Sequence, residues 1–178
     1  MDRRMIKTQN ALKTSLLKLL ERDTIEAITV TDICERSNIV RRTFYAHYTD
    51  KFELVEHIMD DYINDFIEIC KYRESPDFEA GTIRWFKFLN QNKLVFRVFF
   101  NSSISSIFLK KFEYNVKKEI FSKLKSEYKD HPILKEKTLL VFLTSAILGV
   151  MYDYCTHNNK NYKRKAQEVV ILMEPYLE

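Results

Sequence analysis

Apolar residues recur at helical spacing along most of the chain, and strand-like alternation is rare. The first helix is predicted over residues 2–22, with an apolar face made by Met5, Leu12, Leu16, Leu19 and Leu20. Further helices are predicted at about 30–37, 41–48, 50–72, 77–91, 93–101, 104–128, 132–157 and 162–176. Only two Gly and three Pro occur in 178 residues, which disfavours many short strands. The pattern therefore predicts an all-α fold of about nine helices.

One boundary along the chain is clearer than the others. Ser75-Pro76-Asp77 combines a Ser cap, a Pro at the first helical position and an acid in the first turn. We therefore expect a three-helix head over residues 1–51, a connecting helix over 50–72 and a helical bundle over 73–178. The head-to-body junction is expected within or just after the connecting helix.

Residues 31–48 predict two short helices joined by a three-residue turn, which is the helix-turn-helix arrangement. Thr29 and Asp32 have capping-box spacing at the start of the first helix. Asn38 lies in the turn and is among the few residues that tolerate a left-handed backbone. Ile33, Ile39 and Phe44 are spaced to pack the two helices together.

The outward side of the second short helix is polar and basic. Its residues are Arg41, Arg42, Thr43, Tyr45 and His47. Arg forks onto guanine or phosphate, and Thr and Tyr hydroxyls donate to phosphates. Residues 36–49 hold three Arg, one His and no acid, as a phosphate-facing surface needs. On residue types alone, a solvated basic face on an ordinary helical hairpin fits equally well.

Two stretches of the head resemble the tetracycline-repressor-like (TetR) family of transcriptional regulators. They are Ile28-Thr-Val-Thr-Asp-Ile-Cys34 and the following Arg-Arg-Thr-Phe-Tyr-Ala-His-Tyr-Thr-Asp-Lys51, and the resemblance covers roughly residues 5–57. It implies a helix-turn-helix head, a long connecting helix and a larger helical body. It also implies that the protein binds double-stranded DNA through its head.

The resemblance assigns roles to seven residues by position. The implied DNA-binding residues are Thr31, Arg41, Arg42, Thr43, Tyr45, His47 and Lys51. Thr31 and Lys51, at the starts of two helices, are expected to contact phosphates. Asn38 stands where the family usually has Gly, which the backbone argument accommodates. Val40 stands where a capping residue is common, and Val is a poor N-cap, so a contact by residue 40 is not assigned.

The last two predicted helices are candidates for a homodimer interface. Residues 139–152 are apolar on nearly every face, so such a helix needs cover from all sides. The resemblance implies a four-helix bundle between two copies of the chain. The expected interface residues are Leu143, Ile147, Val150, Val169, Val170 and Met173. The alternative is a central helix of a monomeric body.

The middle of the chain is dense in aromatic residues. Members of the family often bind an effector in the body, and the candidate effector pocket is formed by Trp85, Phe88, Phe99 and Phe112. Aromatic residues at helical spacing are more often ordinary core, which is the alternative. The stretch 149–154 resembles the regulators of dihydroxyacetone kinase operons, some of which act through protein partners. A co-regulator acting mainly through a protein partner is therefore the second functional hypothesis.

Signatures of catalysis, cofactors and metals are not expected. The four His are scattered, and two isolated Gly cannot form a P-loop or GxGxxG motif. Three widely spaced Cys predict neither a disulfide framework nor a zinc site. Asp60, Asp61 and Asp65 could pass for metal ligands, but a solvated helix face is the preferred interpretation.

The first ten residues lack the apolar core of a signal peptide, and the longest apolar run spans about 14 residues. A cytoplasmic protein without a membrane segment is expected. The sequence therefore predicts a repressor that binds a palindromic operator as a homodimer and is released by a small-molecule effector. It does not give the operator, the regulated genes, the effector or the sign of regulation.

Overall fold

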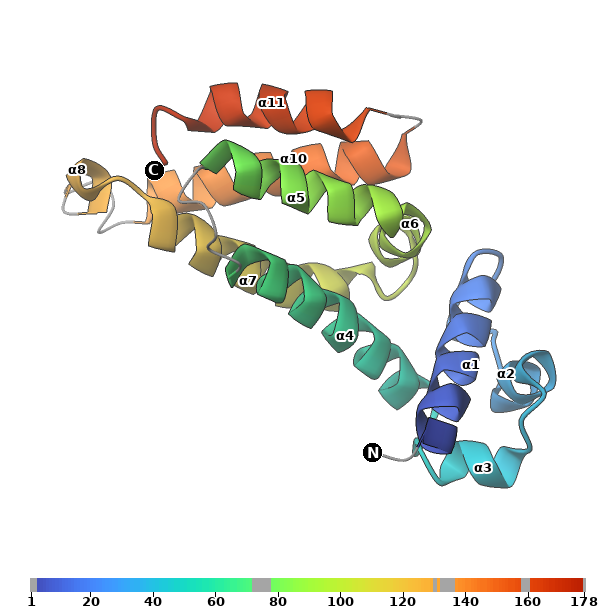
Figure 1. The fold of residues 1–178 in the computed structure, drawn as a ribbon. Coiled ribbons are helices and arrows are strands. Elements are labelled where there is room, and N and C mark those ends of the chain that lie inside the picture. Colours follow the sequence, from blue (N-terminus) through green and yellow to red (C-terminus); the bar gives the residue numbers. More distant parts are fainter. Residues whose placement is uncertain (1–2, 72–77, 130, 132–136, 158–160, 178) are drawn as a thin grey trace.

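The computed structural model describes residues 3–71, 78–129, 131, 137–157 and 161–177. Ten helices and no strand are present in these ranges, which confirms the predicted all-α fold. Figure 1 shows three helices at one end, a long helix leading away from them, and a bundle of the remaining helices. The predicted Ser75-Pro76-Asp77 boundary lies outside the described residues.

The head is built from α1 (Arg3–Leu20), α2 (Val30–Ser37) and α3 (Arg41–Tyr45). α1 buries Leu12, Leu16 and Leu20 on the face predicted from its periodicity. Ile33 of α2 and Phe44 of α3 are completely buried, and Ile39 packs against the same core. The spacing of these apolar residues thus packs the two short helices together, as predicted, and α2 also contacts α1.

α4 (Lys51–Lys71) contacts both the head and the body. In the body, the Phe66 ring centroid is 5.3 Å from that of Trp85 and 4.9 Å from that of Phe112. Toward the head, the His57 ring centroid is 5.5 Å from that of Tyr48. Two adjacent carboxylates on α4 make ion pairs on different sides. Asp61 pairs with Lys13 of α1, and Asp60 lies 2.8 Å from Lys111 of the body.

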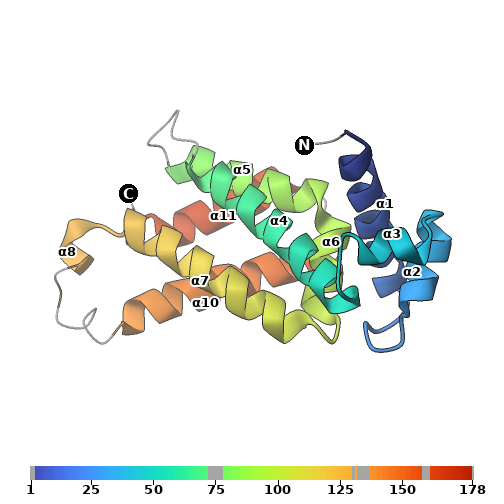
Figure 2. The same cartoon turned by 90° about the horizontal axis from the view of Figure 1, so that it is seen from below.

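The body contains the other six described helices. They are α5 (Phe78–Gln91), α6 (Lys93–Asn101), α7 (Ser105–Lys123), α8 (Ser126–Lys129), α10 (Thr138–Thr156) and α11 (Tyr162–Met173). Figure 2 shows this bundle from below, with α7 and α10 close to each other, and these two helices are in contact. α11 packs chiefly against α5.

One predicted helix, over residues 104–128, is interrupted. Leu124 is extended and completely buried, and it forms an isolated antiparallel bridge with Leu177. The N–H of Lys125 donates to the carbonyl of Tyr176 at 3.0 Å. This long-range pairing with the end of the chain replaces helical hydrogen bonds, which local periodicity could not reveal.

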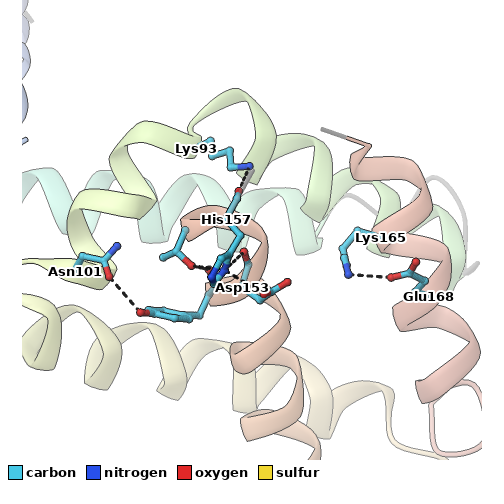
Figure 3. Close-up of polar contacts among 8 residues, drawn as sticks. Lys93, Asn101, Asp153, His157, Lys165 and Glu168 are labelled. Atoms are coloured by element: carbon cyan, nitrogen blue, oxygen red, sulfur yellow. Dashed lines mark hydrogen bonds and ion pairs between the residues drawn. The ribbon is translucent and has the colours of Figure 1, made fainter. Parts of the chain in front are cut away.

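Polar contacts fix the end of α10 against α6 (Figure 3). The Lys93 ammonium donates to the carbonyl of His157 at 2.8 Å, and the Tyr152 hydroxyl lies 3.2 Å from the Asn101 amide oxygen. His157 also pairs with Asp153 at 3.1 Å. Because α6 also contacts α1, this corner of the body lies directly against the head.

α10 is the one helix in the described ranges that is long and apolar enough to cross a membrane by length and composition. It contacts α5, α6, α7 and α11. Seven of its residues are buried: Leu140, Leu143, Thr144, Ile147, Met151, Tyr154 and Cys155. The body thus covers one side of α10, while Val141, Phe142 and Tyr152 are exposed.

Candidate nucleic-acid interface

The first short helix of the head begins with the predicted capping box. The Asp32 N–H donates to the Thr29 hydroxyl at 3.1 Å, and the Thr29 N–H donates to the Asp32 carboxylate at 2.7 Å. The Thr29 hydroxyl also donates to the Asp32 carboxylate at 2.6 Å, and this bond, together with the one from the Thr29 N–H, holds the pKa of Asp32 below its ordinary value. The capped first turn leaves Thr31 exposed at the surface of the head.

The turn between α2 and α3 depends on Asn38. Its backbone is left-handed, with φ 55° and ψ 42°, as predicted. Its N–H donates to the Glu35 carbonyl at 3.2 Å, and the Ile39 N–H donates to the Cys34 carbonyl at 3.0 Å. This closure ends α2 and directs the chain into α3.

We predict opposite effects for two substitutions of Asn38. Asn38→Gly is expected to keep or slightly raise stability, since glycine adopts this conformation freely. Asn38→Val is expected to cost about 1–2 kcal/mol, because a β-branched residue is strained at positive φ. Urea unfolding of both variants measures this difference. Equal stability of the two variants would contradict the assigned backbone conformation.

α3 presents most of its polar residues to solvent and one aromatic residue to the core. Phe44 is completely buried, whereas Arg41, Arg42 and Tyr45 are exposed and Thr43 and His47 are partly exposed. The Arg41 guanidinium carbon lies 5.9 Å from the centre of the Tyr45 ring, a cation–π contact that favours an ordered pair. The five residues predicted on the outside of this helix are thus all at least partly accessible, with His47 two residues after the end of α3.

The predicted phosphate contact of Lys51 requires its ammonium group to face the DNA. In the structure, this group forms hydrogen bonds within the head instead. The ammonium donates to the carbonyls of Glu26 at 2.9 Å and Ile28 at 2.6 Å. The Asp50 carboxylate accepts from the N–H groups of Phe52 at 2.8 Å and Glu53 at 2.9 Å, in the first turn of α4. Lys51 therefore joins the segment before α2 to the start of α4, and its contact with DNA stays a prediction.

We predict that Lys51→Met destabilises the head. The substitution removes two charge-assisted hydrogen bonds to carbonyl oxygens, so the expected cost is about 2 kcal/mol. Lys7→Met on the exposed side of α1 is the matched control and is expected to cost less than about 0.5 kcal/mol. Urea unfolding followed by circular dichroism measures both. A Lys51→Met protein as stable as the control would show that these bonds contribute little.

Two further residues belong to the basic surface but were not assigned a site role from the sequence. Arg36, near the end of α2, is exposed close to the turn. Val40 precedes α3 and is 70% exposed. In the sequence, Arg36 belongs to segment 36–49, which contains no acidic residue. Val40 is an apolar residue at a position where a helix-capping residue is common. Together with Arg41 and Arg42, they extend the surface across the turn.

The predicted dimer residues need correction, because most of them are covered by their own chain. Leu143, Ile147, Val169 and Met173 are at most 5% exposed. They face the body because α10 packs on α6 and α7, and α11 packs on α5. Val150 and Val170 are partly buried against the same core.

The exposed apolar residues of the last two helices lie at other positions. On α10 they are Val141, Phe142 and Tyr152, and on α11 they are Ile171 and Leu172, with exposed fractions between 42% and 70%. Ser145 and Gly149, which lie between Phe142 and Tyr152 in α10, are also exposed. A Cβ added at Gly149 would meet no atom within 4 Å, so this part of α10 is open to close approach. We call these seven residues the α10–α11 surface.

The four residues of the predicted effector pocket form part of a filled aromatic core. Trp85, Phe88, Phe99 and Phe112 are each at most 8% exposed. Phe108 connects two of them, with ring centroids 4.8 Å from Phe99 and 5.1 Å from Phe112. Surface cavities of the described residues are lined by other side chains, and one of about 1070 Å³ lies between α4 and α7. These aromatic residues are therefore better described as ordinary core than as the lining of an effector pocket.

Structural roles also account for the described cysteines and for two acidic residues of α4. Cys34 and Cys155 are buried free thiols, and burial raises the pKa of Cys155 to about 12, which keeps it protonated. Within the described ranges, no group of three His, Cys, Asp or Glu residues could hold a metal ion. Asp60 and Asp61 instead pair with lysines of the body and the head.

Comparisons with known proteins find the chain similar to proteins that are named as transcriptional regulators. No family model matches the chain. An uncharacterized HTH-type transcriptional regulator of Bacillus subtilis, YxbF, is 36% identical over 77 residues, which are 43% of this chain and 20% of that protein. The HTH-type dhaKLM operon transcriptional activator DhaS of Lactococcus lactis is 22% identical over 96% of this chain and 91% of its own length.

A solved structure extends the similarity over the whole fold. The crystal structure of a TetR transcriptional regulator from Streptococcus agalactiae is 23% identical, covers 97% of this chain and 96% of its own, and has a TM-score of 0.73. The chain therefore has the fold of TetR-family transcriptional regulators.

Proposed function

We propose that this protein is a DNA-binding transcriptional regulator of the TetR type that binds a palindromic operator as a homodimer. The observation that carries the proposal is the exposed basic surface of the head: Arg41 and Arg42 project from α3, which buried Phe44 holds to the core, and Arg36 is exposed near the end of α2. Such a helix can enter a major groove, with Arg, Thr and Tyr side chains reaching base edges and phosphates. The regulator names of the similar proteins support this function.

The first experiment tests for phosphate-driven binding. DNA from upstream of the protein's own gene is titrated in a gel shift at several salt concentrations. We expect each doubling of salt to weaken binding by at least about tenfold, because several phosphates release counterions. Affinity that does not change with salt would contradict a DNA interface built on this basic surface.

The homodimer is proposed on the α10–α11 surface. Exposed apolar residues and small residues on neighbouring helices are typical of a self-complementary contact, and symmetric dimers are the commonest oligomers. A dimer also presents two heads to two half-sites of one duplex, which a palindromic operator requires.

Repression and release by a small-molecule effector are the proposed mode of regulation. The Lactococcus relative is named an activator, so the opposite sign has to be tested directly. Deleting the gene and measuring transcripts of its neighbours separates the two. Transcripts that rise after deletion support repression, and transcripts that fall would show activation.

We infer a cytoplasmic, non-catalytic role for the chain. The similar proteins reported above are named as regulators, and DNA binding requires access to the chromosome. The buried thiols Cys34 and Cys155 are not exposed nucleophiles, in line with a binding function.

A further inference from the structure

Val40 is among the most exposed apolar side chains of the protein, and it lies on the basic surface of the head. It is 70% exposed, whereas the nearby Ile33, Phe44 and Tyr48 are at most 2% exposed. Its backbone is fixed: its carbonyl accepts hydrogen bonds from the N–H groups of Thr43 at 2.9 Å and Phe44 at 3.2 Å. The isopropyl group is thus held outside the head at the start of α3.

This position departs from the rules that stabilise helices elsewhere in the head. α2 starts with a complete capping box, whereas no side chain caps the start of α3. Ser, Thr, Asp or Asn at residue 40 would stabilise the helix and would also remove an apolar group from water. A residue that breaks two local rules at once, without a packing partner, is typical of a functional position.

The chemistry that surrounds Val40 indicates what it contacts. The next two residues, Arg41 and Arg42, are exposed and carry donors suited to guanine and phosphate. In the major groove, the apolar group that a base presents is the C5 methyl of thymine. A valine loses little rotamer freedom on contact because its χ1 is already restricted.

We propose that Val40 is a specificity-determining residue that reads the 5-methyl group of a thymine in the major groove, next to the base pair contacted by Arg41. This rests on the proposed function, since α3 has to enter the groove for the contact to form. The proposal assigns one base identity in each half-site to an apolar contact rather than a hydrogen bond.

The test uses the wild-type protein and chemically altered DNA. A random duplex pool is enriched for binding, and each thymine of the selected half-site is then replaced in turn by deoxyuridine, which lacks only the methyl group. Replacement at one position is expected to weaken binding about fourfold, and about fifteenfold when both half-sites are changed, as for loss of one or two buried methyl groups. Replacement at the other thymines is expected to change affinity less than twofold.

Variants of the protein assign the effect to residue 40. Val40→Ser is expected to bind thymine and deoxyuridine sites equally, and to unfold at a higher temperature because serine caps α3. A merely structural valine would not give a more stable protein with altered base preference. Leu94→Ser, which changes an apolar residue 45% exposed on α6, is the control and is expected to keep the wild-type preference.

The outcomes separate the role of Val40 from DNA binding itself. Enriched DNA whose affinity ignores every deoxyuridine replacement overturns the role of Val40 and leaves DNA binding intact. A Val40→Ser protein that still loses the same factor on deoxyuridine DNA also overturns it. A pool that yields no enriched sequence overturns the proposed function and the inference with it.

Discussion

Phe142→Glu is expected to convert the protein from dimer to monomer and to weaken operator binding by at least about 100-fold. Phe142 is 61% exposed near the start of α10, so the substitution disturbs few contacts within one chain. In a two-fold contact, the introduced carboxylate lies against the apolar groups of a second copy and is desolvated without a cation. A single head loses the gain that two linked half-sites provide, which is typically 10²- to 10⁴-fold.

Analytical ultracentrifugation gives the mass, and a gel shift with the selected operator gives the affinity. Tyr114→Glu on α7 is the matched control, because Tyr114 is a 69% exposed aromatic residue outside the α10–α11 surface. The control is expected to remain dimeric and to bind DNA as the wild type does. A Phe142→Glu protein that sediments as a dimer would move the interface to another part of the body.

The double variant Arg41→Ala, Arg42→Ala is expected to lose at least about 100-fold in affinity for the selected operator. Each arginine that contacts a base or phosphate contributes about 1–3 kcal/mol, and the proposed dimer presents two copies of the pair. Both side chains are exposed, and the core contact of α3 is made by Phe44, so the head is expected to stay folded.

The matched control removes the same number of charges from the body. Lys110→Ala, Lys118→Ala changes two exposed lysines on α7 and is expected to weaken binding less than threefold, through the long-range field alone. Equal losses in the two double variants would show that net charge, and not the surface around α3, drives binding. Circular dichroism confirms that each variant retains its helices.

The head was more predictable from sequence than the body because its signals are local. The capping box at Thr29 and Asp32, the left-handed Asn38 and the buried Phe44 each follow from spacing over a few residues. Lys51 is the exception in this part of the chain. Its bonds join residues that are 23 and 25 positions apart, and sequence spacing gives no sign of them.

The body was harder to predict because its helices are apolar on several sides. α10 presents apolar residues all around, so periodicity could not separate the buried Leu143 from the exposed Phe142. α11 shows the same ambiguity, with buried Met173 next to exposed Leu172. The aromatic residues of the middle helices are a further example. A filled core and the lining of a cavity have the same sequence pattern, and only the packing of the side chains distinguishes the two.

The bond network of Lys51 has a geometric consequence for a dimer. By joining the segment before α2 to the first turn of α4, it couples the orientation of the head to the front of α4. In a dimer, the distance between the two α3 helices then depends on the angle at which α4 packs on the bundle. Successive half-sites on one side of a duplex are about 34 Å apart, so a small change in that tilt is enough to take both helices out of register.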